Sequence, residues 1–380
     1  MKIVGLITEY NPFHNGHLYH LQKAKEMTGA DAAVAVMSGN YVQRGLPAVT
    51  EKYSRARAAV MAGVDAVIEL PLIFALSSAE GFARGAVSTL EKLGCITDIV
   101  YGTEAAEEDI GLIKSTAGLL IDEPESYREL LRAFQKEGMS FPKARAAAAE
   151  SICHGAGRIL SGPNNILAVE YEKAILTLGC GIKTHSIRRS DEGYLESATA
   201  IRQLIEKDDN DSLRRLLPEC SLKTLRYHIS ADDFTDLLNY KITMSSEAEL
   251  TRYLDVNDEI AARIKKVCRN GISFSQLASE VSSKNYTESR ARRCLLHILL
   301  DIKADSPAPS FIRCLAFNSK SGVMKRIKES AKAPLVCNLS ECEASGYVLD
   351  ERAALVYNDV VRSKYGISLP DEYHAGVFRM

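Results

Sequence analysis

Two histidines near the amino terminus are spaced for phosphate chemistry. His14 and His17 stand three residues apart with Gly16 between them, directly after a hydrophobic segment and at the start of a helical pattern. Imidazole N–H groups can hydrogen-bond a triphosphate and stabilise charge that develops on a pyrophosphate leaving group. The glycine allows a nucleotide to approach the backbone, and the positive end of a helix favours phosphate. The pattern therefore predicts a nucleotide site.

Other roles for these histidines are less well supported. A capping or core role would explain one histidine near a helix start, but not the pair. Zinc would need a cysteine or carboxylate at ligand spacing beside His14, His17 and His20, and the sequence has none there. We therefore predict no metal site. His20 could extend the cluster or face solvent.

The first 200 residues alternate between strand-like and helix-length segments. The expected strands are Lys2–Thr8, Ala32–Ser38, Val64–Leu70, Asp98–Gly102 and Lys183–Arg188. The expected helices cover residues 17–28, 53–62, 79–93, 105–120 and 164–178. This alternation predicts an α/β fold, with a Rossmann-like parallel sheet covered by helices on both faces. Ligands bind beyond the carboxyl ends of such strands, which directs attention to the loops after Thr8, Ser38 and Gly102.

The second half of the chain has a different character. Residues 201–380 read as a mainly helical region with a small mixed segment near 311–380, so we expect one domain over 1–200 and another over 201–380. Residues 251–333 hold 16 basic against 8 acidic residues, a net charge of +8, although the whole chain carries only −2. A basic segment thus follows an acidic one.

Composition excludes several classes of protein. No apolar run reaches the roughly 18 to 20 residues that span a membrane, and the amino terminus becomes polar too soon for a signal peptide. The nine cysteines are scattered, odd in number and without a C-x-x-C pair, which argues against a disulfide framework and a zinc site. We expect a cytoplasmic protein without a membrane partner.

Longer strings around the histidines resemble a known family. His14-Asn15-Gly16-His17 is similar to the H-x-G-H signature of the nucleotidyltransferase superfamily that includes class I aminoacyl-tRNA synthetases. More specific are the strings GLITEYNPFHNGH (5–17), MSGNYVQRG (37–45), GPNNIL (162–167) and SATAIR (197–202). Together they resemble the bacterial tRNA(Met) cytidine acetate ligase family over nearly the whole chain.

The resemblance implies a two-step reaction in a nucleotidyltransferase domain followed by a tRNA-binding region. ATP and acetate would form acetyl-adenylate and pyrophosphate, and the acetyl group would pass to N4 of the wobble cytidine of elongator tRNA(Met). His14 and His17 would be catalytic. Magnesium is expected because ATP is used, with the triphosphate as its main ligand. The implied ATP contacts are Ile7, Thr8, Glu9, Tyr10, Asn11, Pro12, Phe13, His14, Asn15, Gly16, His17, Leu18, Tyr19, His20, Gly102, Asn165 and Arg188.

The last three contacts have ordinary alternatives. Gly102 could be a turn glycine. An asparagine is a favoured helix cap, so capping explains either Asn164 or Asn165, and we assign the nucleotide contact to Asn165. Arg188 and Arg189 could be a solvated pair rather than a phosphate clamp.

Two further segments could reach the ligand. Ser197, Thr199 and Arg202 lie in a predicted helix start that resembles a phosphate-binding segment of the wider superfamily, although no K-M-S-K-S string is present. The loop 38–47, which carries Arg44, could be a lid, a wall of the acetate site or a plain surface loop.

Three basic clusters suggest RNA. Clusters of this kind with an interleaved aromatic suit phosphate contact and base stacking, although a charge run is also typical of a solvated helix face. Their members are Arg263, Lys265, Lys266 and Arg269; Lys284, Tyr286, Arg290, Arg292 and Arg293; and Lys320, Lys325, Arg326 and Lys328.

Two other functions stay open on the residues alone. A small-molecule adenylyltransferase would use the same H-x-G-H chemistry but would not need the basic second half. A non-catalytic RNA-binding protein would not need intact His14 and His17. The sequence does not fix the acetate-binding residues, the residues that read the tRNA bases or the oligomeric state.

Overall fold

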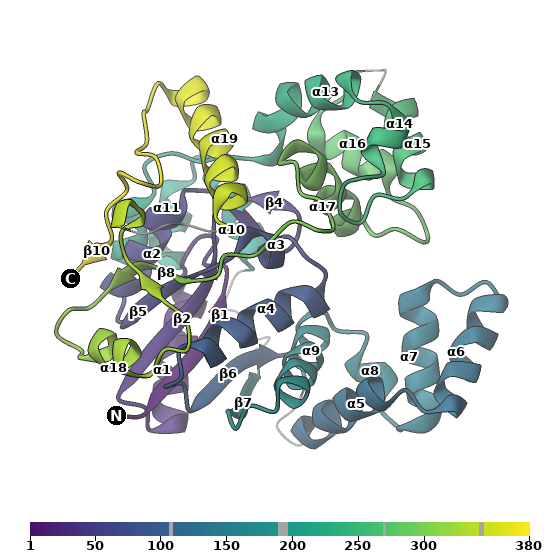
Figure 1. The fold of residues 1–380 in the computed structure, drawn as a ribbon, viewed down its shortest axis with the longest axis horizontal. Coiled ribbons are helices and arrows are strands. Elements are labelled where there is room, and N and C mark those ends of the chain that lie inside the picture. The colour runs from purple at the N-terminus through teal and green to yellow at the C-terminus, as the bar shows by residue number, and fades with distance from the viewer. Residues whose placement is uncertain (106–108, 189–196, 269–270, 342–345) are drawn as a thin grey trace.

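An eight-stranded sheet lies at the centre of the molecule (Figure 1). The computed structural model describes residues 1–105, 109–188, 197–268, 271–341 and 346–380. The strand order is β10-β8-β5-β2-β1-β6-β7, and β9 pairs with β8 beside this path. The strands are β1 (Ile3–Thr8), β2 (Ala32–Ser38), β5 (Ala66–Leu70), β6 (Asp98–Thr103), β7 (Lys183–Arg188), β8 (Ile312–Phe317), β9 (Leu335–Val336) and β10 (Phe378–Arg379). A separate two-stranded hairpin consists of β3 (Tyr41–Val42) and β4 (Leu46–Pro47).

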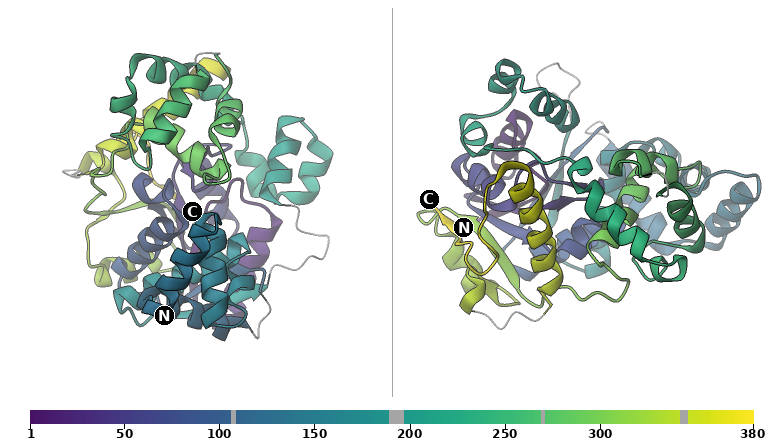
Figure 2. Two further views of the ribbon diagram at one scale, coloured as in Figure 1. Left: turned by 90° about the vertical axis from the view of Figure 1, so that its right-hand side faces the viewer. Right: turned by 90° about the horizontal axis from the view of Figure 1, so that it is seen from above.

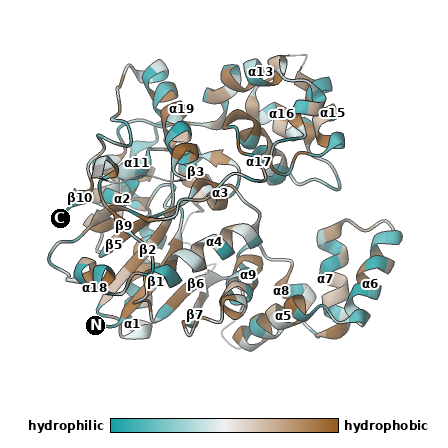
Figure 3. Ribbon diagram, viewed as in Figure 1, coloured by the Kyte–Doolittle hydropathy of each residue, from teal (hydrophilic) through white to brown (hydrophobic). Residues whose placement is uncertain are grey.

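The predicted α/β architecture is confirmed. All five expected strands are present, and β5, β2, β1, β6 and β7 run parallel to one another. The helices α1 (Asn15–Thr28) and α2 (Lys52–Met61) pack on one face, and α4 (Ala79–Lys92) and α9 (Pro163–Leu178) on the other. Alternation along β2 supplies both cores, because Val34 and Val36 face α4 and α9 whereas Ala33 and Ala35 face α1 and α2. The central strands are accordingly mainly apolar (Figure 3).

The remaining helices gather in groups around the sheet (Figures 1 and 2). One group projects from the β6 side and includes three helices that the sequence did not predict, α6, α7 and α8. Its members are α5 (Ile110–Asp122), α6 (Glu125–Lys136), α7 (Phe141–Ile152) and α8 (Ala156–Ile159). A second group comprises α10 (Ala198–Glu206), α11 (Asn210–Leu216) and α12 (Glu219–Thr224). A third, here called the helical lobe, comprises α13 (Thr235–Met244), α14 (Glu247–Leu250), α15 (Asp258–Cys268), α16 (Phe274–Val281) and α17 (Glu288–Leu299), and its apolar core continues into residues of β3, α3 (Leu72–Ala75) and α19 (Val348–Tyr365). Further short helices are η2 (Ala231–Phe234), α18 (Val323–Ser330) and η3 (Leu339–Glu341).

The sheet does not end with the first 200 residues. Strand β8 pairs antiparallel with β5, and β9 and β10 pair with β8. The sequence analysis expected residues 311–380 to be a small mixed segment of the second domain, whereas its strands extend the central sheet. The expected domain boundary at residue 200 is thus not a boundary of the sheet, because three strands that follow residue 200 in the sequence belong to it.

A buried charged network fastens the carboxyl-terminal segment to the sheet. The ammonium of Lys52 lies 2.6 Å from Glu69 Oε1 at the end of β5 and 2.9 Å from Glu372 Oε2. The Tyr347 hydroxyl donates to Glu372 Oε2 at 2.7 Å, and Tyr53 donates to the same oxygen at 2.8 Å. Lys52, Glu69 and Glu372 are each at most 5% exposed, so the two carboxylates compensate a fully desolvated cation.

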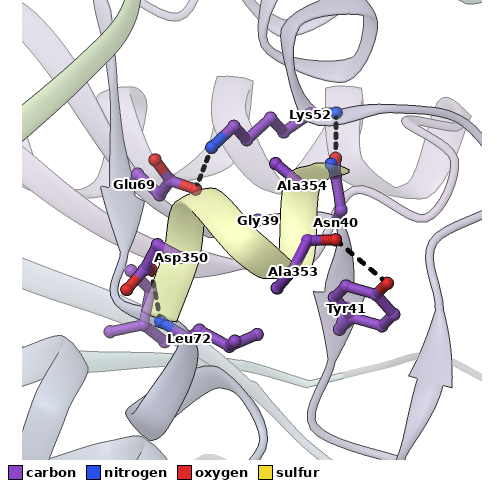
Figure 4. A pocket seen from close by; sticks show the side chains of 10 residues that line it. Gly39, Asn40, Tyr41, Lys52, Glu69, Leu72, Asp350, Ala353 and Ala354 are labelled. Atoms are coloured by element: carbon purple, nitrogen blue, oxygen red, sulfur yellow. Dashed lines mark hydrogen bonds and ion pairs between the residues drawn. The ribbon is translucent and has the colours of Figure 1, made fainter. Parts of the chain in front are cut away.

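A small cavity next to this network contains one unusual carboxyl group (Figure 4). Asp350 of α19 accepts a hydrogen bond from Leu72 N at 2.8 Å through Oδ1. Its Oδ2 is buried and has no hydrogen-bond partner among the described residues. Burial, followed by the charge of Glu69, raises the pKa of Asp350 to about 8. The side chain is therefore protonated in the folded protein at pH 7.

Protonation of Asp350 should make stability depend on pH. The unfolded side chain has its ordinary pKa of about 4, so its contribution to stability is present below that pH and is lost as the pH rises towards 8. Asp350→Asn mimics the protonated group. Between pH 6 and 8 the free energy of unfolding of the wild type should fall by roughly 2 kcal/mol more than that of the variant. Urea denaturation at both pH values measures this difference, and parallel pH dependence of the two proteins would contradict it.

Candidate functional site

The ends of three strands meet beside the two histidines. Gly5 pairs with Ile99, and Gly102 pairs with Ile187, so Thr8 of β1 lies level with Gly102 of β6 and the end of β7. The chain crosses from β1 to β2 on one side and later enters β6 on the other. The carboxyl ends of β1 and β6 thus form the switch point at which open α/β sheets bind ligands.

The first turn of α1 fixes both histidine rings. His14 is the N-cap residue of α1, and its Nδ1 accepts a hydrogen bond from Gly16 N at 3.1 Å. His14 N in turn donates to His17 Nδ1 at 3.3 Å. The two rings stack with centroids 3.8 Å apart. Since Nδ1 of each neutral ring is an acceptor, the ring proton is on Nε2, which makes each Nε2–H a donor.

The loop before the helix has a tightly specified backbone. Tyr10 has a φ of 46°, and the Asn11–Pro12 peptide bond is cis. Tyr10 packs edge-on against Phe13 and His17, with centroids 4.8 and 5.0 Å apart. The Asn11 side chain accepts a hydrogen bond from Val49 N at 2.7 Å. The aromatic residues of this loop therefore pack against the His17 ring and hold it in position.

The predicted contacts between residues 7 and 20 occupy one continuous path. Ile7 and Thr8 end β1, residues 9–13 form the loop, and residues 15–20 form the first turns of α1. Asn15 donates to Arg215 O at 2.9 Å, and Ser221 donates to Phe13 O at 2.7 Å, so the group α10–α12 borders this path. Tyr19 is 47% exposed and lies at the outer edge.

Glu9 is the first residue of this loop, and its side chain reaches the hairpin β3–β4. Its Oε1 accepts a hydrogen bond from Gln43 N at 2.8 Å. Loss of solvent raises the pKa of Glu9. The Gln43 hydrogen bond and the positive charges of Arg44, Arg202 and Arg55 oppose that rise. The Glu9 carboxyl group thus joins the loop after β1 to the hairpin β3–β4, and the nearby arginine charges favour its ionised form.

Arg55 is a functional-site residue that the sequence analysis missed. It is 1% exposed, and its Nη1 donates to Glu9 O at 2.5 Å and to Ser38 O at 3.2 Å. Its Nε donates to Thr50 O at 3.0 Å, and its Nη2 donates to Gly39 O. One guanidinium therefore joins the loops that follow β1 and β2. The signal in the sequence was a charge on the same helical face as the buried Lys52 and Ala59.

Asn165 has a structural partner at the predicted position. Its Oδ1 accepts hydrogen bonds from Glu104 N at 2.9 Å and Ala105 N at 3.1 Å, just beyond β6. Glu104 reciprocates, because its carboxylate accepts from the backbone N–H groups of Asn164 and Asn165 at the start of α9. The expectation that one asparagine caps this helix is wrong: Gly162 is the N-cap residue and Glu104 supplies the acceptor.

The other predicted contacts lie at the same edge of the sheet. Gly102 is in β6 and Arg188 is exposed at the end of β7, where it pairs with Thr103. Ser197 is the N-cap residue of α10, and its hydroxyl accepts from Ala200 N at 3.2 Å. Arg202 donates to Asn11 O and to Thr199 Oγ1, each at 3.0 Å. Arg189 lies outside the described residues.

Arg44, Arg202 and Arg292 form what we call the arginine junction. Burial lowers the pKa of Arg202, and the charges of Glu9, Arg44 and Arg292 act on it as well. The hairpin packs so closely on α17 that a Cβ on Gly45 would lie 2.7 Å from the Cβ of Arg292. The junction therefore connects the loop before α1 (residues 9–14, here called the histidine loop) to the helical lobe.

The three predicted basic clusters do not form one surface. Many members bind the protein itself: Arg263 donates to Ser282 O, Lys265 to Ser245 O, Lys284 to Gly138 O and buried Arg293 to Gln43 O. Arg290 lies over the ring of Tyr286, 5.1 Å from its centroid. The exposed residues Lys320, Lys325, Arg326 and Lys328 lie in or beside α18, across the molecule from the helical lobe (Figures 1 and 2). Arg269 lies outside the described residues.

The part of the chain that the structure describes offers neither a metal cluster nor a membrane-spanning helix. Within it, no group of three or more His, Cys, Asp or Glu side chains is arranged to hold a metal ion. None of its helices has the length and apolar character that crossing a membrane requires.

Comparison with known proteins places the chain among nucleotidyltransferases. The model of the HIGH Nucleotidyl Transferase family matches residues 1–368. A tRNA(Met) cytidine acetate ligase of Thermoanaerobacter sp. is 37% identical over 363 residues, which cover 90% of each chain. Another from Caldicellulosiruptor saccharolyticus is 40% identical over 353 residues, which cover 87% of this chain and 86% of the relative.

A solved structure shares the whole fold. Thermotoga maritima TmcAL bound with alpha-thio ATP superposes with a TM-score of 0.92 at 31% identity, and each chain is covered completely. Its apo form gives a TM-score of 0.89 at 30% identity.

Arg55 should be essential for the shape of the site. Arg55→Lys leaves several buried carbonyl oxygens without a donor, so the free energy of unfolding should fall by roughly 2–4 kcal/mol. Arg57→Lys is a matched control, because Arg57 is exposed on the same helix and should change stability by less than about 0.5 kcal/mol. Urea denaturation compares the variants. Equal stability of the two would show that the carbonyl contacts are not required.

Proposed function

Because this chain belongs to the tRNA(Met) cytidine acetate ligase family of HIGH nucleotidyltransferases, we propose that it acetylates the wobble cytidine of elongator tRNA(Met). In the first step a carboxylate oxygen of acetate attacks the α-phosphorus of ATP, and pyrophosphate leaves. In the second step N4 of the cytidine attacks the carbonyl carbon of acetyl-adenylate. AMP leaves, and the N4 group loses one proton.

The observation that carries the first step is the paired histidine geometry. Backbone N–H groups hold Nδ1 of both rings, so both Nε2–H groups are donors at the positive end of α1. Donors fixed before the reaction stabilise developing negative charge without reorganising. We assign the pyrophosphate leaving group to His14 and His17. The reaction needs no protein nucleophile, which fits a loop of histidines, amides and a helix end.

The proposed ATP contacts follow the strand ends. The path from Ile7 to His20 would hold the phosphates and ribose, with Gly102 and Arg188 on the neighbouring strands. Asn165 supports the loop after β6 through Oδ1, so its role towards ATP would be chiefly to position Glu104 and Ala105.

Magnesium would accompany the triphosphate. The described residues offer no carboxylate cluster for it, and we derive no step through the metal.

The second step requires the anticodon to reach the adenylate. The arginine junction suits this role because it lies between the histidine loop and the helical lobe. Guanidinium groups bind phosphates in a fork geometry and are weakly hydrated. We infer that phosphates near the wobble nucleotide bind here, while the exposed charges of the helical lobe hold more distant parts of the tRNA.

The function has a direct test. The protein is incubated with ATP, labelled acetate and unmodified tRNA(Met), and the tRNA is digested to nucleosides. We expect labelled N4-acetylcytidine. Pyrophosphate exchange that ignores acetate but requires a phosphorylated precursor would instead indicate a small-molecule adenylyltransferase, and tRNA binding without exchange would indicate a non-catalytic RNA-binding protein.

The two nitrogen atoms of His14 can be tested separately. His14→Asn retains an acceptor for Gly16 N but lacks the Nε2–H donor, whereas His14→Ala loses both. Both variants, and His17→Ala, should slow acetate-dependent pyrophosphate exchange by roughly 10²–10³-fold. The affinity for tRNA should stay within about twofold, since phosphate contacts elsewhere dominate it. His154→Ala is the control, because His154 is fully exposed. Near-wild-type exchange in His14→Asn would restrict His14 to helix capping.

Arg44 distinguishes tRNA contact from ATP contact. Arg44→Ala removes an exposed charge and should weaken tRNA binding by about tenfold at moderate salt while reducing the salt dependence. Acetate-dependent pyrophosphate exchange without tRNA should change by less than about twofold, because the charge lies outside the histidine pair. Arg326→Ala on α18 is the control and should bind tRNA normally. Weaker binding in the control alone would move the docking surface to α18.

A further inference from the structure

Two cysteines face each other at the junction of β8 and β9. The strands are parallel with Arg313 paired to Val336, so the next residues along each strand are Cys314 and Cys337. Cys314 is fully buried and Cys337 is half-buried. Residues at matching positions of paired parallel strands point to the same face of the sheet, so the two thiol groups lie side by side. Although cysteines looked scattered in the sequence, two that are 23 residues apart are neighbours in the sheet.

The surroundings distinguish the two sulfur atoms. The hydrogen bond with Cys314 lowers the pKa of Cys337 to about 7, against the opposing effect of burial, and the charges of Lys328, Arg313 and Arg379 also lower it. The same hydrogen bond and burial raise the pKa of Cys314. A partly exposed thiolate beside a second thiol is the arrangement typical of peroxide-sensitive cysteines.

We propose that Cys314 and Cys337 form a dithiol that peroxide oxidises reversibly to a disulfide. The Cys337 thiolate attacks one oxygen of hydrogen peroxide, and the O–O bond breaks. The product is a sulfenic acid at Cys337, and the departing hydroxide becomes water by taking up a proton. Cys314 then loses its proton and attacks the Cys337 sulfur, which forms the S–S bond and breaks the S–O bond. The second water leaves, so two electrons pass from the two thiols to one peroxide.

Peptide mapping of the full-length protein tests the proposal. The protein is treated briefly with hydrogen peroxide, alkylated and digested with trypsin, which gives one peptide with Cys314 (314–320) and one with Cys337 and Cys342 (333–352). We expect these peptides to be linked, and fragmentation should assign the link to Cys337. A link inside 333–352, a link from Cys314 to Cys342, or no link in folded protein would each overturn the proposal. Dithiothreitol should restore both free peptides.

Variants separate the two roles. Cys337→Ser should abolish the cross-link. Cys314→Ser should leave a sulfenic acid at Cys337 that dimedone traps. Cys153→Ser removes another half-buried thiol, and the cross-link should form at the wild-type rate. The rate should rise about tenfold from pH 6 to pH 8, because the reactive form is the thiolate. Dimedone labelling confined to cysteines other than Cys337 in Cys314→Ser would assign the oxidation elsewhere.

Discussion

A single buried guanidinium fixes the loops after β1 and β2 relative to each other. Arg55 donates to carbonyl oxygens of the loops after β1 and β2 and of Thr50 before its own helix. Desolvation lowers its pKa, whereas Glu51 and Glu9 favour the charged form. Because one guanidinium makes four hydrogen bonds, to carbonyl groups of both loops and of Thr50, the two loops cannot move independently. The position of Glu9, and through the loop that of the histidines, depends on this contact.

Local signals in the sequence were sufficient for most of the α/β core. Strands β1, β2, β5 and β6 are short, mainly apolar runs between helix-length segments, whereas β7 (KTHSIR) is mainly polar; the residues that decide these strands are close neighbours in the chain. His14 and Gly16 could be interpreted for the same reason, because a helix start is a local structure. The resemblance to a family added the acetate and tRNA chemistry, which the spacing alone leaves open.

What could not be predicted depends on contacts between distant residues. Glu104 caps the start of α9 although it lies 60 residues earlier in the chain. The sequence does not reveal this contact, because the Asn164-Asn165 pair at the helix start offers a local capping residue instead. Basic residues such as Lys265 and Arg293 look like a nucleic-acid surface in the sequence, yet Lys265 donates to a carbonyl group of its own lobe and Arg293 donates to Gln43 O in the hairpin β3–β4. Nothing in the sequence of the antiparallel strand β8 distinguishes a sixth strand of this sheet from a strand of a separate domain.

Strand β8 also has a consequence for biosynthesis. Residues of β5 appear early from the ribosome, but their partner in the sheet is made almost 250 residues later. Until then one edge of β5 is open, and the charged network around Lys52 lacks Glu372 and Tyr347. A nascent chain that ends before β8 cannot complete the sheet beneath the loop at residues 9–13. The final form of this sheet edge therefore depends on the synthesis of β8 and of Glu372.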